Sequence, residues 1–390
     1  MMMYFPRKGG GNDLKSIINV KIYTGKEVIE SGFIRYDEKI MSIDHMEKFV
    51  EQGETIVDGN GTILIPGMID IHIHGAYDVD AMDANPSSIV KMSKKMLKEG
   101  VTTFFPTTMT QSHSNIKNAL SALKKAKELG GHFEYIHLEG PFVNKERAGA
   151  QPLEYIVNPD VELFKTWQEA AGGLIKLVTY APEVEGANDL EQEFQKTGVI
   201  GTVGHSDAIG ADFEGKKITH ATHLYNQMRP MHHREVGTVG HVLLDDEVMV
   251  EVIPDGIHIH PDMVKLAYRL KGAKKISVIT DAMRAKGLAD GEYELGGQPV
   301  FVKENSARLA DGTLAGSILK MDEAFRNIMK FTGCSPEEAV QMTSVNQAEE
   351  FGLVNKGALE IGKDADFVQM TDEYNVVDTI RLGKSMDEVK

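Results

Sequence analysis

The middle of the chain alternates short apolar runs with helical segments, and this rhythm limits the possible folds more than any other feature. Segments such as 88–100 and 115–130 have apolar residues at helical spacing, lysine-rich outer faces and a closing glycine. Eight runs rich in β-branched and aromatic residues occur, in the order ILIPGMIDIHIH, GVTTFFPT, YIHLEGPF, LIKLVTYAPE, VIGTVGHSDA, ITHATHLYN, VMVEVIPDG and KISVITDAM. Eight strand–helix repeats predict an α/β fold of the (β/α)8 TIM-barrel type.

The two ends of the chain follow a different pattern. Residues 16–58 and 357–383 consist of short alternating segments separated by glycine and charged turn residues, a pattern typical of a small β module. We therefore expect segments 14–66 and 357–390 to build one small β-sandwich domain, and residues 67–356 to form the barrel.

Composition excludes several classes of protein. The single cysteine, Cys334, rules out a disulfide within the chain and a cysteine metal cluster, so any metal site must use His, Asp and Glu. A formal net charge of -16 argues against nucleic acid and anionic membranes as partners. Neither a bilayer-length apolar run nor the apolar region of a signal peptide is present. These features predict a cytoplasmic protein.

Side chains suited to metal binding fall at the ends of five predicted strands. His72 and His74 lie two apart in GMIDIHIHGA, a spacing that places both on one face of a strand. Single residues occupy the ends of the third, fifth, sixth and eighth runs: Glu139, His205, His223 and Asp281. A barrel gathers such positions at its active-site mouth. This set predicts a catalytic divalent metal, or two ions bridged by one carboxylate.

Each of these residues also has an ordinary explanation when taken alone. The histidine pair fits polar positions on a strand, His205 fits a hydrogen-bonded loop, and Glu139 or Asp281 fits a helix cap or turn. Their common position at one pole of the barrel favours the metal site. His137 shares a face with Glu139 but lies one layer deeper, which predicts a packed residue behind the site. Four other histidines are expected to be ordinary surface residues: His45, His113, His132 and His241.

Five motifs, in this order, carry a family resemblance: HLEGPF, GHSDA, THLYNQM, DGIHIHP and ITDAM. With PGMIDIHIHG at the first strand, they resemble the amidohydrolase superfamily and, within it, the N-acetylglucosamine-6-phosphate deacetylase family. The resemblance spans about residues 60 to 375. It implies hydrolysis of the acetamide of N-acetylglucosamine 6-phosphate to glucosamine 6-phosphate and acetate.

The resemblance also implies the roles of the strand-end residues. Glu139, His205 and His223 would hold a first divalent ion, which could be zinc, iron, manganese or cobalt. The family branch with a His-x-His pair can hold a second ion, so His72 and His74 would serve it, with Glu139 bridging. No predicted strand end offers a lysine for the carboxylated-lysine bridge of other amidohydrolases. Asp281 would act as general base and then general acid, and as a ligand if two ions bind.

A second group of residues is implied on the substrate side. Arg234 would bind phosphate, in the neighbouring subunit's site of a homodimer. Gln151 stands where some relatives carry histidine and would steady the acetyl carbonyl. The other implied contacts are Ala150, Asn226, Gln227, His258 and the backbone of Leu314, Ala315 and Gly316.

Two other functions remain open at this point. The chain could be an amidohydrolase for a cyclic amide or an aminoacyl substrate, although HLYNQM and HHREVG argue against it. It could also be a barrel that binds metal and a sugar phosphate without turnover. A pure binder needs no general base, so Asp281 beside a full ligand set disfavours that second possibility.

Overall fold

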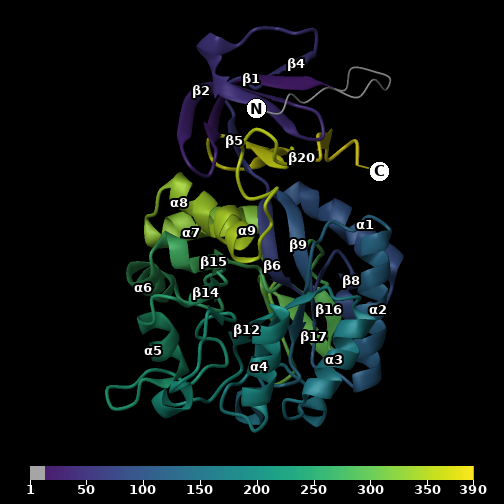
Figure 1. Cartoon of the computed structure of the whole chain (residues 1–390), viewed down its shortest axis with the longest axis vertical. Coiled ribbons are helices and arrows are strands. Elements are labelled where there is room, and N and C mark those ends of the chain that lie inside the picture. The colour runs from purple at the N-terminus through teal and green to yellow at the C-terminus, as the bar shows by residue number, and fades with distance from the viewer. Residues whose placement is uncertain (1–13, 390) are drawn as a thin grey trace.

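The apolar runs form one parallel sheet that closes into a barrel in the computed structural model, which describes residues 14–389 (Figure 1). The strands in spatial order are β6 (Met68–Ile73), β9 (Val101–Thr108), β10 (Ile136–Glu139), β11 (Ile175–Tyr180), β12 (Ile200–Val203), β13 (His220–Ala221), β14 (Met249–Val252) and β15 (Ile276–Val278). The circle closes just beyond β15, where Ala282 bridges Ile73 and the Asp281 amide donates to the His72 carbonyl at 2.9 Å. The predicted (β/α)8 fold is confirmed.

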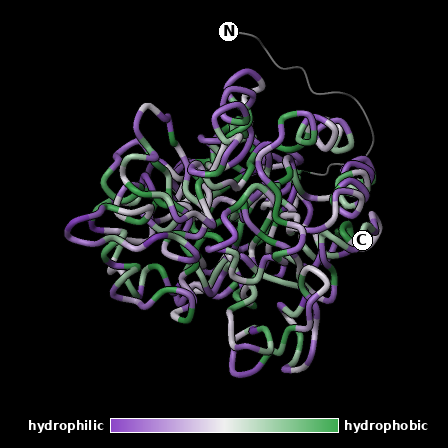
Figure 2. The backbone as a smooth tube through the Cα atoms, turned by 90° about the horizontal axis from the view of Figure 1, so that it is seen from below, coloured by the Kyte–Doolittle hydropathy of each residue, from purple (hydrophilic) through white to green (hydrophobic). Residues whose placement is uncertain are grey.

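Helices pack around this sheet through their apolar faces. They are α1 (Pro86–Met96), α2 (His113–Glu128), α3 (Val161–Ala170), α4 (Ala187–Thr197), α5 (Gly237–Leu244), α6 (Pro261–Lys271), α7 (Met321–Thr332), α8 (Pro336–Val340) and α9 (Asn346–Glu350). Viewed along the long axis, hydrophobic segments concentrate toward the centre and hydrophilic segments form most of the rim (Figure 2). No helix within residues 14–389 is long and apolar enough to cross a membrane.

The first two of these helices begin slightly earlier than the sequence pattern indicated. Asn85 caps α1 by accepting from the Ser88 amide, and Pro86 occupies its first turn. Ser112 caps α2 by accepting from the Asn115 amide. A capping side chain satisfies an otherwise unpaired amide of the first turn, so the cap sets the start of the helix before the apolar repeat does.

Strands from both ends of the chain share a second sheet, drawn at the top of Figure 1. These strands are β1 (Lys15–Tyr23), β2 (Val28–Tyr36), β3 (Ile40–His45), β4 (Thr55–Asp58), β5 (Ile63–Pro66), β19 (Phe367–Met370), β20 (Val376–Arg381) and β21 (Lys384–Ser385). Although β1 and β5 separate β2 from β19, the Tyr36 and Phe367 rings lie 5.0 Å apart. The sheet therefore curls over its own apolar core.

The first apolar run is divided between the two sheets. Its ILIP part is β5 of the terminal sheet, and only the part after Gly67 enters the barrel. A Cβ at Gly67 would lie 2.2 Å from the Thr102 hydroxyl, so the chain passes β9 too closely for a side chain. Both halves of this run are apolar, so hydrophobicity alone does not separate its two strands.

A three-stranded antiparallel sheet between β15 and α7 was not anticipated from the sequence. It contains β16 (Gly291–Leu295), β17 (Gln298–Lys303) and β18 (Ser306–Arg308). The alternate residues Val300 and Val302 of β17 are buried, and they belong to one apolar cluster with Met283. The alternation and the glycine pair 296–297 were the available signals.

Two histidines expected at the surface lie elsewhere. His132 is only 3% exposed, and burial, together with the nearby Arg381 charge, lowers its pKa to about 3. His241 is half-buried and stacks on Phe213 with ring centroids 3.8 Å apart. The imidazole ring has an apolar body that can pack in a core. A prediction of exposure from residue type alone does not take this into account.

A buried ion pair links the first helical layer to the segment that follows β15. Lys286 Nζ lies 2.9 Å from Glu99 Oε2, and both side chains are almost fully buried. Glu99 also accepts from the Met321 amide at the start of α7 and from the Tyr77 hydroxyl. The pair thus connects three parts of the chain that are distant in sequence.

We expect Lys286→Met to lower the free energy of unfolding by about 3–5 kcal/mol, because it leaves the Glu99 carboxylate buried without its counter-charge. Chemical denaturation measures this loss. The double variant Lys286→Met/Glu99→Gln, which removes both charges, should recover part of the stability. A loss below about 1 kcal/mol in the single variant would show that Glu99 is compensated by its other partners alone.

Candidate active site and metal centre

All six strand-end residues predicted from the sequence meet at the carboxyl ends of the barrel strands. His72 lies in β6 and His74 directly after it, while Glu139 is the last residue of β10. The other three follow their strands by two or three residues, and all have positive φ angles: 48° at His205, 28° at His223 and 48° at Asp281. Such backbone is unfavourable for residues other than glycine and is concentrated at functional sites. Here it turns each side chain toward the barrel axis.

Glu139 lies at the centre of this group. Its Oε1 atom is 3.1 Å from His223 Nε2 and 3.4 Å from His205 Nε2. Its Oε2 atom is 3.1 Å from His74 Nε2. The two oxygens of one carboxylate therefore face different histidines, which is the arrangement of a bridging ligand.

Two clusters within this centre have ligand atoms close enough to hold an ion. Glu139, His205 and His223 form one, and His72, His74 and Asp281 form the other, with all ligand atoms of each cluster within 4.8 Å of one another. Asp281 Oδ1 lies 3.4 Å from His72 Nε2 and 3.3 Å from His74 Nε2. Imidazole and carboxylate ligands of this kind suit borderline divalent metals.

The orientation of the imidazoles tests whether the centre fits a metal. The Nδ1 atoms of His74 and His205 contact backbone carbonyls, of Thr107 at 3.2 Å and of Arg147 at 2.8 Å. His72 Nδ1 contacts a Glu251 carboxylate oxygen at 2.9 Å. Because these oxygens only accept, each Nδ1 carries a proton, and each Nε2 faces the centre as the atom that can bind a metal once its own proton is lost. His72 Nε2 is buried without a hydrogen-bond partner, as expected of a ligand atom.

The charges in the centre also favour a cation. Burial lowers the pKa of His74, but hydrogen bonds to Asp281 and Glu139 outweigh it and raise the pKa to about 10. Burial raises the pKa of Glu139, while the His72 charge and hydrogen bonds from His205 and His223 hold it well below its usual range. The raised pKa of His74 and the lowered pKa of Glu139 have one cause: buried, ionised carboxylates are stabilised by positive charge nearby. A bound cation would supply such charge.

A second layer of polar residues lies beneath the centre. His137 packs its ring 4.5 Å from that of His72 and contacts the Thr179 hydroxyl at 2.7 Å. Glu251, which the sequence reasoning missed, contacts both His72 and His220, and His220 in turn contacts Glu350 at 2.7 Å. Glu251 is a single acidic residue in the apolar run VMVEV, and that contrast was the signal available in the sequence.

The metal-ligand centre opens into a cavity of about 340 Å³. This volume lies near the lower end of the range for small-molecule sites, roughly 300–1,000 Å³. The cavity wall includes most of the residues expected to contact substrate: Ala150, Gln151, Asn226, Gln227, His258, Leu314 and Gly316. Gln151 donates to Glu139 Oε2 at 3.0 Å and accepts from the Thr110 amide, so its side chain is fixed.

Two expected contacts are not part of the cavity within this chain. Ala315 is fully buried and packs in the apolar core of the insertion, between Leu314 and Gly316 of the cavity wall, and its expected backbone contact stays a prediction. Arg234 is exposed on the loop between β13 and α5, a projection at the lower left of Figure 1, where its Nη1 lies 2.6 Å from His233 Nε2. It borders a separate surface groove of about 500 Å³ with Leu243 and Leu244.

Other residues line the cavity although the sequence reasoning did not select them: Met109, Gly149, Leu295, Arg308 and Thr313. Three of these belong to the unanticipated insertion or the turn after it. No lysine lines the cavity among the described residues.

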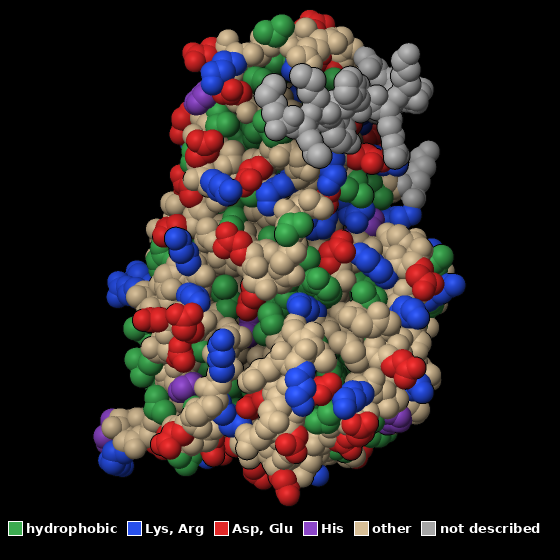
Figure 3. All heavy atoms as spheres, viewed as in Figure 1, with side chains coloured by type: hydrophobic (Ala, Val, Ile, Leu, Met, Phe, Trp, Pro, Cys, Tyr) green, Lys and Arg blue, Asp and Glu red, His purple; other side chains and the backbone are tan. Residues whose placement is uncertain are grey.

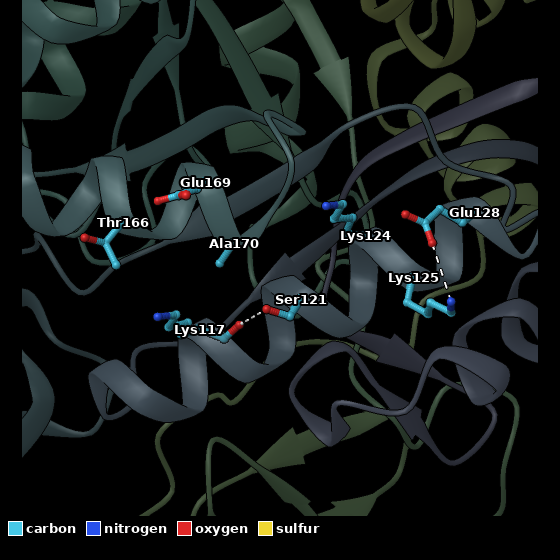
Figure 4. Close-up of a pocket in the computed structure, with 8 residues that line it drawn as sticks. All are labelled: Lys117, Ser121, Lys124, Lys125, Glu128, Thr166, Glu169 and Ala170. Carbon is cyan, nitrogen blue, oxygen red and sulfur yellow. Dashed lines mark hydrogen bonds and ion pairs between the residues drawn. The ribbon is translucent and has the colours of Figure 1, made fainter.

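A larger hollow of about 510 Å³ lies on the surface between α2 and α3 (Figure 4). Its charged side chains are Lys117, Lys124, Lys125, Glu128 and Glu169. Lys125 pairs with Glu128 at 3.7 Å, and the Ser121 hydroxyl donates to its own helix. On the face shown in Figure 3, acidic and basic side chains are intermingled in the same way. These are features of a solvated surface, so the candidate chemistry lies at the barrel mouth.

Comparisons with known proteins agree with this centre. The model of the amidohydrolase family matches residues 63–386. An N-acetylglucosamine-6-phosphate deacetylase of Bacillus subtilis (strain 168) is 46% identical over 378 residues, covering 94% of this chain and 96% of the relative. The crystal structure of the Pasteurella multocida N-acetylglucosamine-6-phosphate deacetylase matches with a TM-score of 0.90 at 28% identity, covering 95% of this chain and 99% of that one. An N-acetylgalactosamine-6-phosphate deacetylase of Escherichia coli O157:H7 is 33% identical, covering 83% of this chain and 87% of the relative.

The fold, the histidine and carboxylate centre and these matches define the class of protein. The chain belongs to the amidohydrolase family and is a hydrolase. Over nearly its whole length it is similar to the N-acetylglucosamine-6-phosphate deacetylases of that family.

Metal binding to this centre should release protons. Without metal, His74 has a pKa of about 10 and that of His72 is also raised well above its usual value, so both are charged at pH 7. A ligand histidine must be neutral, so saturating metal-free protein with zinc should displace about two protons per chain from this pair. An indicator dye in weak buffer measures them. The variant His72→Asn/His74→Asn should release fewer, and equal release from both proteins would contradict this assignment.

Proposed function

We propose that the protein removes acetate from N-acetylglucosamine 6-phosphate to give glucosamine 6-phosphate in amino-sugar catabolism. The observation that carries this proposal is the placement of Asp281 at the edge of a complete ligand centre that opens into a sugar-sized cavity. The similarity to deacetylases over nearly the whole chain supports the choice of substrate. A phosphorylated sugar is charged and does not cross membranes freely, so we place the reaction in the cytoplasm.

The ligand clusters divide between two ions in this proposal. Glu139, His205 and His223 would hold the first, and His72, His74 and Asp281 would hold the second, with Glu139 next to both groups. A divalent ion held there would supply Lewis acidity, which lowers the pKa of water to near 7 and polarises a carbonyl. Zinc, iron, manganese and cobalt all accept these ligands.

Asp281 handles the proton. Burial raises the pKa of its carboxyl, but the His72 charge and a hydrogen bond from His74 lower it below the ordinary value, so Asp281 is ionised and able to accept. It takes the proton from the attacking water as general base. It then donates this proton to the sugar nitrogen, because an amine leaves far more readily than an amide anion.

The cavity wall positions the sugar. His258 Nδ1 is held by Asp255 Oδ2 at 2.7 Å, which directs its other ring nitrogen away from Asp255 for substrate. Asn226 and Gln227 follow His223 closely in the chain and place amide groups beside the first ion cluster. Gln151 and Ala150 lie on the acetyl side, near Glu139, and the backbone of Leu314 and Gly316 completes the wall.

Arg234 acts in a neighbouring subunit in this proposal. Its loop projects from the barrel, and its side chain lies outside the cavity of its own chain. The adjoining groove contains Leu244 and Leu270, which are 70% and 46% exposed and are suited to burial against a second copy. A homodimer would bring the guanidinium to the partner's phosphosugar.

Asp281→Asn should lower kcat for the phosphosugar by about 10²–10⁴-fold, because the amide neither accepts nor donates the catalytic proton. Acetate release measures activity, and elemental analysis shows whether metal remains bound. The control is Asp262→Asn, whose carboxylate is 85% exposed on α6. Near wild-type turnover by a metal-loaded Asp281→Asn variant would remove Asp281 from this role.

Mixing two weakened variants tests the contribution across subunits. Arg234→Ala and Asp281→Asn chains should each be impaired alone, but a hybrid dimer contains one site with an intact Asp281 and the partner's Arg234. Co-refolded or co-expressed chains with different tags should therefore regain activity on N-acetylglucosamine 6-phosphate. Purified hybrids without any recovery would show that Arg234 does not serve the neighbouring site.

A further inference from the structure

One cation in the cavity has no role in the chemistry described so far. Arg308 is the only Lys or Arg among the described residues that line the cavity. The two carboxylates there, Glu139 and Asp281, are engaged by histidines. In a chain with a net charge of -16, an isolated arginine in a substrate cavity requires an explanation.

The insertion fixes the position of Arg308. It is the last residue of β18, where it pairs with Phe301 of β17 on one side and bridges Leu314 on the other. The intervening turn is tight, since the Leu309 amide donates to the Thr313 carbonyl at 2.8 Å. This hairpin places Arg308 and Thr313 together on the cavity wall.

Most of the guanidinium is available for a ligand. Within residues 14–389, Arg308 forms no ion pair, and its side chain makes one hydrogen bond, from Nη1 to the Gly312 carbonyl at 2.8 Å. A guanidinium has five N–H donors, so four are left for an anion. Two of them in parallel match two phosphate oxygens.

His258 provides a second donor near this arginine. It lines the same cavity as Arg308, and its Nδ1 atom is held by Asp255 Oδ2 at 2.7 Å. Together with Thr313, these two residues bring hydrogen-bond donors to the wall of one cavity. The carboxylates near them, of Asp255, Glu139 and Asp281, are each engaged by a histidine.

We propose that Arg308 binds the 6-phosphate of the substrate from within the same subunit and so contributes to the preference for phosphorylated sugars. This inference rests on the proposed deacetylase function. It assigns to each chain its own phosphate-binding cation, and the partner's Arg234 adds to it across the interface.

Kinetics on paired substrates test the proposal. For Arg308→Ala we expect kcat/KM on N-acetylglucosamine 6-phosphate to fall about 10- to 100-fold, mainly through KM, as loss of charge-assisted hydrogen bonds predicts. The loss on unphosphorylated N-acetylglucosamine should be much smaller. Arg308→Lys, which keeps the charge but not the paired donors, should fall between. Lys303→Ala is the matched control, since Lys303 lies on the same small sheet with its side chain 80% exposed and outside the cavity.

A mixing experiment separates the two arginines. Arg308→Ala chains combined with Asp281→Asn chains should not regain activity, because each site then lacks either its own Arg308 or its own Asp281. Recovery comparable to that expected for Arg234 would show that Arg308 acts across the interface and would overturn the assignment.

Two further outcomes are decisive. Equal losses on both sugars would mean that Arg308 only braces the turn at Gly312, and the proposal would be wrong. If wild-type protein deacetylates neither sugar, the proposed function fails, and binding of glucose 6-phosphate compared with glucose then decides the role of Arg308. A preference for glucose 6-phosphate that Arg308→Ala abolishes would support the anion site, and a preference that the variant retains would refute it.

Discussion

Closure of the barrel between its last and first strands is the contact on which the rest of the site depends. The Asp281 amide donates to the His72 carbonyl, the His74 amide donates to the Ala282 carbonyl, and the buried Asp70 carboxylate accepts from the Thr280 hydroxyl at 2.6 Å. These bonds join the two ends of the sheet. They also place Asp281 beside the first-strand histidines, although more than two hundred residues separate them in the chain.

The centre is held by mutual compensation of buried charge. Burial of a carboxylate or an imidazole raises the free energy of the folded state unless the group forms a hydrogen bond or an ion pair. Glu139 is oriented by Gln151, and His72 by Glu251, which His220 holds in turn. Backbone carbonyls fix the rings of His74 and His205, so the protein's own contacts direct these candidate ligand atoms toward the centre. Preorganisation of this kind lets a metal site bind its ion without a large ordering cost.

The chemistry and the recognition of substrate come from different parts of the molecule. The carboxyl ends of the barrel strands and the residues directly after them supply the six residues of the candidate metal centre, and the strands are rigid because both faces of the sheet are packed. Loops and the β16–β18 insertion supply the cavity wall, including Arg308 and Thr313. Variation in such segments can change the ligand that a barrel accepts while the residues at the strand ends stay the same.

The sequence alone determined the barrel, since eight strand–helix repeats allow few other closures, and it determined the six strand-end residues, since the carboxyl ends of barrel strands meet. Tertiary structure decided what depends on packing between distant segments. The burial of His132 and the support of His72 by Glu251 follow from neighbours that no local pattern shows. Arg308 escaped notice for the same reason: in the sequence it is an ordinary charged residue near a turn, and only the folded insertion brings it to the cavity.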